Sequence, residues 1–131
     1  MSADGKVAFV KSKGYELKND TWSWGATGPD GILLLVSNEK KYSQYLGKGR
    51  ALYWLWGGHE QDTSDGGAER KQHIDAIKAG TPAKAAYYTP DFTGGKEKIE
   101  SIAPELWRVL EIREPDEQGR IYALLEKEMP R

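Results

Sequence analysis

Short apolar runs alternate with clusters of Gly, Pro, Asn and Asp along most of the chain, a pattern typical of strands joined by tight turns. The segments predicted as strands are residues 6–11 (KVAFVK), 14–18, 21–26 (TWSWGA), 32–37 (ILLLVS), 51–56 (ALYWLW), 84–89 (KAAYYT), 107–113 (WRVLEIR) and 120–126 (RIYALLE). Turn residues at 28–31 (GPDG) and 115–119 (PDEQG) join their flanking strands into hairpins. We therefore expect a sheet whose strands are mostly antiparallel.

One segment has the character of a helix. Residues 68–79 (AERKQHIDAIKA) are good helix formers, and Gly80 and Pro82 follow as stop signals. Ile74 and Ile77 give this helix a thin apolar stripe. A second, short helix is predicted after Pro104, over the letters PELW. The predicted fold class is α+β, with one main helix and one short helix.

Composition narrows the class of protein. A chain of 131 residues with 38% hydrophobic residues suits a single domain over residues 1–131. The absence of Cys excludes thiolate nucleophiles, Cys-ligated zinc, iron–sulfur clusters and disulfide scaffolds. No run approaches the ~20 apolar residues of a membrane span, and the start MSADGKVAFVKSK lacks the apolar core of a signal peptide. We expect a cytoplasmic protein with no cofactor and no membrane partner.

Charge is balanced overall but uneven along the chain. The formal net charge is −1. Residues 1–60 carry eight basic and six acidic side chains, whereas residues 91–131 carry seven basic and ten acidic ones. A phosphate-bearing partner would be attracted by the first part and repelled by the last. The alternative is a solvated surface that binds nothing.

Two Trp-x-Trp steps are the most distinctive feature of the sequence. On a strand, such a step places both indoles on one face, and two such strands side by side would form an aromatic wall. Indole rings stack on nucleobases and can enclose a flipped or modified base. The candidate residues for binding a ligand or base are Trp22, Ser23, Trp24, Trp54 and Trp56. The alternative is that these indoles add bulk to the core.

Basic residues interleaved with aromatic rings form a second candidate site. Basic groups hold phosphate while rings stack on bases, which is what a nucleic-acid backbone channel needs. The candidate backbone contacts are Lys40, Lys41, Lys48 and Arg50, in a loop with Tyr42 and Tyr45, and Arg70 and Lys71 on the first turns of the predicted helix. The alternative is an exposed hairpin loop without a ligand.

Catalytic and metal patterns are weak. Pro29-Asp30 followed by Glu39-Lys40-Lys41 spells the PD…ExK string of magnesium nucleases, but here the ExK falls after the predicted strand. His59-Glu60 with Asp62 and Asp65 could hold a divalent ion, although a flexible acidic loop explains them as well. His73, on the predicted helix, is interpreted as a surface or half-buried residue. The sequence holds no nucleophile elbow, P-loop or GxGxxG, so we expect neither a metal site nor catalysis.

A family resemblance emerges from the order TWSWGA, turn, ILLLV, Gly-rich stretch, ERKQHIDAIKAG and the late hairpin WRVLEIRE–DEQGRIYALLE. This order, over roughly residues 19–126, resembles the recognition modules of modification-dependent HNH restriction endonucleases. More loosely, it resembles the PUA-like superfamily, which includes the SRA, EVE and YTH readers of modified bases. The resemblance implies a strongly curved or barrel-like sheet with a pocket for an extruded base.

The same resemblance would place Trp22 and Trp24, and less directly Trp54 and Trp56, in or beside that pocket, with Arg70 and Lys71 approaching phosphate. The chain departs from such modules in two respects. It carries no HNH nuclease segment, and its net charge is near zero where DNA readers are usually basic. The resemblance therefore fits an isolated recognition module or a stand-alone relative that works with a partner.

Together these features predict a non-enzymatic nucleic-acid-binding module. Its partner would be DNA with a modified or flipped base, and its role would lie in restriction or phage defence beside a partner nuclease. Other classes stay open. Exposed Trp and Tyr are also typical of a small protein-interaction or regulatory domain that binds a partner enzyme. An enzyme, either the weak nuclease pattern or a hydrolase without a visible motif, is another alternative. A binder of a small ligand such as a sugar would use the same rings.

Overall fold

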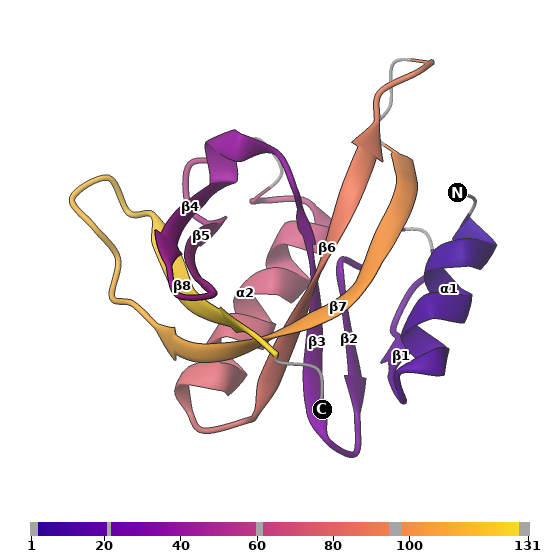
Figure 1. Cartoon of the computed structure of the whole chain (residues 1–131), viewed down its shortest axis with the longest axis horizontal. Coiled ribbons are helices and arrows are strands. Elements are labelled where there is room, and N and C mark those ends of the chain that lie inside the picture. Colours follow the sequence, from indigo (N-terminus) through magenta and orange to yellow (C-terminus); the bar gives the residue numbers. More distant parts are fainter. Residues whose placement is uncertain (1–2, 21, 60–61, 95–97, 129–131) are drawn as a thin grey trace.

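The computed structural model describes residues 3–20, 22–59, 62–94 and 98–128. Its elements are α1 (Ala3–Ser12), β1 (Glu16–Leu17), β2 (Gly25–Gly28), β3 (Gly31–Ser37), the short 3-10 helix η1 (Lys40–Tyr42), β4 (Ser43–Gly47), β5 (Arg50–Trp56), α2 (Asp65–Lys78), β6 (Ala83–Asp91), β7 (Lys98–Ile112) and β8 (Ile121–Lys127). All these strands join one sheet in the order β1-β2-β3-β6-β7-β8-β5-β4 (Figure 1). The predicted α+β class is confirmed.

The strand pairing is mostly antiparallel, as predicted. The exception among the described strands is β3 beside β6, which run parallel from Ile32 opposite Ala83 to Ser37 opposite Tyr88. Parallel neighbours need a long crossover. Here the crossover contains η1, the β4–β5 hairpin and α2. The chain therefore leaves the carboxyl end of β3 and builds several elements before it returns to the same sheet.

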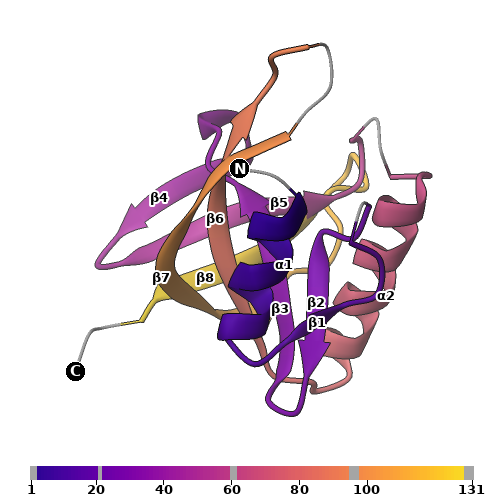
Figure 2. The ribbon, with the colours of Figure 1, turned by 90° about the vertical axis from the view of Figure 1, so that its right-hand side faces the viewer.

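Two apolar cores lie on opposite faces of β3. Successive strand residues point to opposite sides, so Leu34 packs in the core that contains Ile74 of α2, while Leu33 packs in the core that contains Val10 of α1. Figure 2 shows the two helices on either side of β2 and β3. Because both faces of β3 are covered, the run ILLLV is apolar without alternation.

The sheet is open. Strands β1 and β4 form its two edges, and it is not strongly curled, so the strongly curved or barrel-like form expected from the resemblance is not confirmed. Irregular pairing interrupts several ladders, including a register shift between Trp54 and Trp56 of β5. Among the described residues, no helix is long and apolar enough to cross a membrane.

The first predicted strand is wrong. Residues 6–11 lie in α1, where Lys6 and Val10, one helical turn apart, are both buried. The β-branched residues of KVAFVK favour a strand only locally, and packing of one helical face against the sheet overrides that preference.

The predicted strand over residues 21–26 is also wrong, because β2 begins only at Gly25. The Trp-x-Trp step before it is held by a turn instead. The amide of Ser23 donates to the carbonyl of Asn19 at 3.1 Å, and the amide of Trp22 donates to Oδ1 of Asn19 at 3.1 Å. A side chain that binds nearby backbone competes with strand pairing, which explains the failure.

The short helix over PELW is wrong as well, because these residues belong to β7. The ladder with β6 jumps from Ile102 opposite Tyr88 to Leu106 opposite Ala86, so Pro104 sits in a bulge. A proline there removes no ladder hydrogen bond.

The predicted loop over residues 38–50 contains η1 and β4. The strands over 32–37, 51–56, 84–89 and 120–126 and the helix over 68–79 are confirmed within a few residues.

Candidate functional site

A cavity of about 670 Å³ lies where the carboxyl ends of β3 and β6 meet the end of β5 and the start of α2. Rings dominate its wall, which contains Trp24, Tyr42, Tyr53, Trp54, Trp56, His59, Tyr88 and Phe92. Its polar side chains include Ser37, Glu39, Lys41, Asp62 and Arg70. The volume falls in the ~300–1,000 Å³ range of ligand pockets. This cavity is the candidate functional site.

Trp24 enters the cavity wall from the turn that precedes β2. Its ring stacks on Tyr88, with centroids 5.1 Å apart and planes 26° apart. The ammonium of Lys6 lies 5.2 Å from the centre of the same indole. Gly66, on the first turn of α2, presses against this ring. A Cβ there would lie 2.8 Å from the carbonyl oxygen of Trp22 and 3.0 Å from Cδ1 of Trp24, so only glycine allows α2 to begin this close to the Trp22–Trp24 segment.

Ser23 does not line the cavity, because it is completely buried in a polar network behind Trp24. Its hydroxyl accepts from the amide of Asn19 at 3.0 Å and donates to Oε2 of Glu69 at 3.1 Å. The ammonium of Lys6 donates to the carbonyl of Ser23 at 3.1 Å. Burial raises the pKa of Glu69 and lowers the pKa of Lys6. Ser23 therefore links the turn before Trp24 to Glu69 of α2 and Lys6 of α1.

Trp54 belongs to a second group of rings. It stacks on His59 with centroids 4.0 Å apart, and Tyr42 lies 5.0 Å from His59 and 5.6 Å from Trp54. The guanidinium of Arg120 lies 4.4 Å from the centre of the Trp54 ring. Burial lowers the pKa of His59, against the opposing effect of a hydrogen bond to the carbonyl of Trp54. At neutral pH the cavity wall therefore carries an uncharged imidazole that contacts both Trp54 and Tyr42, which also contact each other.

The predicted divalent-ion residues lie in the loop after β5 and, for Asp65, at the first position of α2. The carboxylate of Asp62 is already hydrogen-bonded to the loop backbone. The carboxylate of Asp62 accepts from the amides of Gly57 at 3.3 Å and His59 at 3.1 Å. Glu60 lies outside the described residues. Among the residues that are described, no three His, Asp or Glu side chains form a metal-binding group.

Trp56 lines the cavity beside the start of α2. Its indole N–H donates to the carbonyl of Gly67 at 3.1 Å, and the ammonium of Lys71 lies 5.9 Å from its ring. The predicted wall of two adjacent Trp-x-Trp strands is wrong, because β2 and β5 are not neighbours in the sheet. Trp24, Trp54 and Trp56 instead meet around one cavity. Trp22 is not among the lining residues.

Arg70, predicted as a contact to the nucleic-acid backbone, also lies on the cavity wall. Its Nη2 donates to the carbonyl of Trp24 at 3.0 Å and to that of Leu35 at 2.7 Å. Burial lowers the pKa of this guanidinium. The helix neighbour Lys71 behaves differently, since its ammonium pairs with Asp75 at 2.8 Å on the helix surface.

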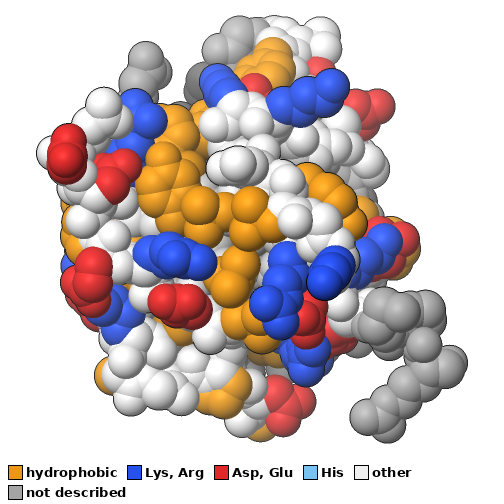
Figure 3. Space-filling model, turned by 60° about the vertical axis from the view of Figure 1, so that its left-hand side comes forward, with side chains coloured by type: hydrophobic (Ala, Val, Ile, Leu, Met, Phe, Trp, Pro, Cys, Tyr) orange, Lys and Arg blue, Asp and Glu red, His pale blue; other side chains and the backbone are white. Residues whose placement is uncertain are grey.

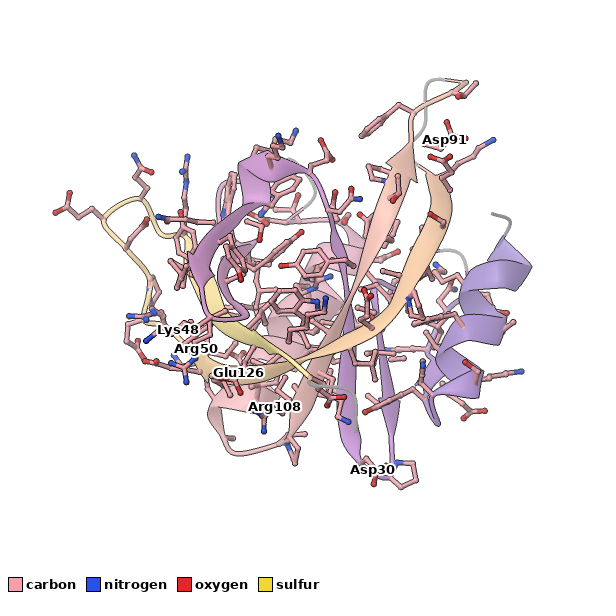
Figure 4. The ribbon with its side chains drawn as sticks, in the orientation of Figure 1. Asp30, Lys48, Arg50, Asp91, Arg108 and Glu126 are labelled. Carbon is pink, nitrogen blue, oxygen red and sulfur yellow. The ribbon has the colours of Figure 1, made fainter. Side chains whose placement is uncertain are left out.

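The other predicted backbone contacts are split between two places. Lys41 lines the cavity, with its side chain 63% exposed, and Lys40 is exposed beside it. Lys48 lies in the turn between β4 and β5, and Arg50 pairs with Glu126 at 3.0 Å. Figure 4 shows Lys48 and Arg50 grouped with Glu126, to which Arg108 also pairs. The six basic residues therefore do not form one channel.

The residues of the magnesium-nuclease pattern do not come together in one site. Asp30 lies in the turn before β3, and Glu39 follows the opposite end of that strand. The seven residues of β3 extend roughly 20 Å, too far for two ligands of one ion. Glu39 accepts from the hydroxyl of Ser37 at 3.2 Å and lies 3.6 Å from the ammonium of Lys41.

The sequence did not indicate Tyr53, Tyr88 and Phe92 as rings of the site, and it indicated Tyr42 and His59 only for a phosphate-binding loop and a metal site. One signal was available for Tyr88, because in the adjacent pair Tyr87-Tyr88 on a strand the two rings must point to opposite faces of the sheet. His73, by contrast, lies outside this cavity, against Gly25. Burial and the neighbouring Arg70 lower the pKa of His73 to about 4.

No protein-family model matches the chain, and neither a curated protein nor a solved structure matches it.

Proposed function

We propose that this chain is a non-enzymatic nucleic-acid-binding module that takes an extruded or modified DNA base into the aromatic cavity. The observation that carries the proposal is the convergence of Trp24, Trp54 and Trp56 on one cavity of about 670 Å³. These rings come from segments far apart in the sequence. Stacking between a base and an aromatic ring contributes about 1–3 kcal/mol, so the loss of even one of these contacts would measurably weaken binding.

The rim of the cavity supports the same function. Phe92 follows β6 on the projecting end of the β6–β7 hairpin and is 56% exposed although it lines the cavity. An exposed ring at the mouth can fill the gap that an extruded base leaves in a duplex, as apolar wedges do. Lys41 at the same rim supplies a cation for the adjacent phosphate.

The proposal includes kinship with the PUA-like readers of modified bases and a role in restriction or phage defence beside a partner nuclease. Its support is a mostly antiparallel sheet with helices on both faces and an aromatic cavity at the strand ends. Within this proposal, any cleavage of DNA belongs to the partner, because the chain's own candidate carboxylates Asp30 and Glu39 stand at opposite ends of β3.

Fluorescence anisotropy with labelled duplexes tests the proposal. The duplexes carry an unmodified, a methylated or a mismatched base at one central position, and each is titrated at several salt concentrations. Binding is expected to weaken with salt and to favour the duplex whose base is easiest to extrude. Trp24→Ala and Phe92→Ala should each lower affinity by roughly 5- to 150-fold, the equivalent of one stacking contact.

Tyr45→Ala is the matched control, because Tyr45 is an aromatic residue that is 67% exposed on β4 and does not line the cavity. It should bind like the unaltered protein. Phe92→Ala removes an exposed ring and is expected to fold normally. Absence of any shift at low salt, or equal losses in Tyr45→Ala and Phe92→Ala, would refute the proposal.

A second candidate function is protein interaction, which the sheet surface away from α2 favours. Figure 3 shows a band of hydrophobic side chains across this side of the molecule, bordered by charged groups of both signs. Leu46 of β4 is 47% exposed and Leu110 of β7 is 42% exposed. Apolar surface of this kind serves contact with a partner enzyme. Stoichiometric binding to a purified nuclease, lost in Leu110→Asp and without any DNA binding, would favour this function.

A further inference from the structure

The two edges of the sheet differ in how they are protected. Strand β1 is two residues long, carries the exposed charge of Glu16 and lies beside α1. Strand β4, at the other edge, pairs only with β5 and lies away from both α-helices (Figure 2). Natural proteins usually protect such an edge by shortness, charge, proline or a covering element, because its unpaired backbone groups can bind another strand.

The free side of β4 presents backbone groups and apolar side chains together. The amide and carbonyl groups of Ser43–Gly47 that point away from β5 have no partner strand. Of the backbone hydrogen bonds that the described residues form outside helices and ladders, none involves residues 44–47. Tyr45 is 67% exposed and Leu46 is 47% exposed beside these groups. A register shift between Tyr45 and Gly47 bends only the end of β4, so an added strand would be short.

The charge around this edge favours an acidic partner. Residues 40–50 carry four basic side chains and no acidic one. Two of the four, Lys41 and Arg50, are paired with carboxylates of other segments. Within the described part of the chain, no ion pair involves the other two, which are Lys40 just before β4 and Lys48 just after it. The strand therefore has an unpaired cation beyond each of its ends.

The same charges disfavour a second copy of the chain at this edge. Two identical strands that pair about a two-fold axis run antiparallel, so each contacts the same residues of the other. Such a pairing of two β4 strands would bring the Lys40 end of one copy beside Lys48 and Arg50 of the other. Like charges that face each other destabilise a strand pair. A strand from another protein, with an acidic residue at each end, would meet a cation at each end.

We propose that the free edge of β4 binds an extended segment of a partner protein, which adds a strand to the sheet. The central residues of this segment are uncharged and β-branched, and Asp or Glu lies at each end. Its backbone pairs with residues 43–46, its side chains contact Tyr45 and Leu46, and its acidic ends meet Lys40 and Lys48. In strand addition the main-chain hydrogen bonds provide affinity and the side chains provide specificity. This inference goes beyond base binding in the cavity and does not depend on it.

Synthetic peptides test this class of partner. The probe is the fluorescein-labelled peptide Glu-Asp-Val-Thr-Val-Thr-Val-Asp-Glu, and its binding is measured by fluorescence anisotropy. A second peptide has Lys in place of each acidic residue, and a third carries N-methyl groups on its central amides. The N-methylated peptide cannot form the ladder, so it should bind at least roughly 10-fold more weakly, the equivalent of about two hydrogen bonds. The Lys-flanked peptide should also bind more weakly than the probe.

Variants locate the peptide on this edge. Lys40→Glu and Lys48→Glu should each weaken binding of the probe roughly 3- to 10-fold and strengthen binding of the Lys-flanked peptide. Lys11→Glu is the matched control, because it reverses an exposed charge on α1. Leu46→Asp should weaken binding of the probe roughly 5-fold or more. Leu110→Asp, at a leucine of similar exposure on β7, should leave it unchanged.

Hydrogen exchange gives the most direct evidence for an added strand, since saturating probe should slow exchange of the amides in residues 43–46. Equal affinity for the probe and the N-methylated peptide, or no binding of the probe at all, would overturn the inference. Equal weakening by Lys11→Glu and Lys48→Glu would overturn the assigned site. Protection of β4 that grows with protein concentration in the absence of peptide would assign the edge to a second copy.

Nucleic acid is the remaining competitor for the basic side chains. A DNA duplex that displaces the probe from Lys40 and Lys48 without slowing exchange in residues 43–46 would assign these cations to phosphate and overturn the inference. Base binding in the cavity is measured separately, with Trp24→Ala and Phe92→Ala. Either proposal can therefore fail while the other stands.

Discussion

Replacement of Ser23 by alanine tests how the Trp24 segment is held. Ser23 is completely buried, and its hydroxyl joins the Asn19 turn to the carboxylate of Glu69 on α2. The other carboxylate oxygen of Glu69, Oε1, is already buried without a hydrogen-bond partner. Ser23→Ala therefore removes two hydrogen bonds. The Asn19 amide loses its acceptor, and the Glu69 carboxylate loses the only group that donates to it among the described residues.

The expected loss of stability follows from these two hydrogen bonds. A bond to a charged group contributes about 1.5–3 kcal/mol and a neutral one about 1 kcal/mol, so the variant should lose about 2–4 kcal/mol. With an unfolding entropy of about 2.1 cal/mol/K per residue, each kcal/mol lowers the melting temperature of a chain of this length by roughly 3–4 °C. The midpoint should therefore fall by roughly 7–15 °C.

Urea and thermal unfolding measure this loss. Ser12→Ala is the matched control, because Ser12 is exposed and its hydroxyl bonds only to the nearby carbonyl of Phe9, so the change should stay within about 0.5 kcal/mol. The cost of Ser23→Ala should be smaller in a Glu69→Gln background, since the acceptor is then neutral. A loss below about 0.5 kcal/mol, or the same loss in both backgrounds, would refute the proposed role of this network.

Two further predictions concern α2. Gly66→Ala places a methyl group 2.8 Å from the carbonyl oxygen of Trp22 and 3.0 Å from Cδ1 of Trp24. This variant should cost about 1–3 kcal/mol in urea unfolding and weaken DNA binding, whereas Ala68→Ser, on the same turn, should do neither. Burial, with Arg70, lowers the pKa of His73 to about 4, so the unfolded chain binds more protons between pH 4 and 6.5. Stability should therefore be complete above pH 6.5 and fall as the pH drops toward 4, and unfolding of His73→Asn across this range should show a weaker dependence. An unchanged slope in that variant would assign the dependence to other groups.

The strands that the sequence predicted well are those with strong local signals. Residues 32–37 and 84–89 are apolar runs bounded by turn residues, and both form strands at those positions. The turn at 28–31 joins β2 to β3, with Gly28 opposite Gly31. Here local preference and the final packing agree, so reading the pattern is sufficient.

The failures occur where distant contacts decide the local structure. Lys6 and Val10 are helical because one face of α1 packs against the sheet, and nothing within residues 6–11 records that contact. Trp22 precedes a strand instead of lying in one, because the Asn19 side chain binds its amide. Pro104 is accommodated by a bulge that only the pairing with β6 reveals.

The same difference between local signals and distant contacts explains what the sequence predicted about the candidate site. The residue types were predictable, since the doubled Trp-x-Trp step indicated an aromatic pocket and three of its four rings line one. The geometry of the site was not predictable, because β2 and β5 are not neighbours in the sheet. Their tryptophans approach one cavity only because the crossover after β3 brings the two segments together. The position of Arg70 depends on carbonyls 35 and 46 residues away, so no local pattern could place it in the cavity.

The most direct test of a guest ring in the cavity is a two-dimensional ¹H–¹⁵N spectrum of the five tryptophan indoles during titration with DNA. A guest ring in the cavity should shift the indole N–H signals of Trp24, Trp54 and Trp56 and leave those of Trp22 and Trp107 unchanged. Trp107 serves as the internal control, because it packs against the α2-side core away from the cavity lining. Saturation of DNA binding with the three cavity signals unmoved would contradict the account.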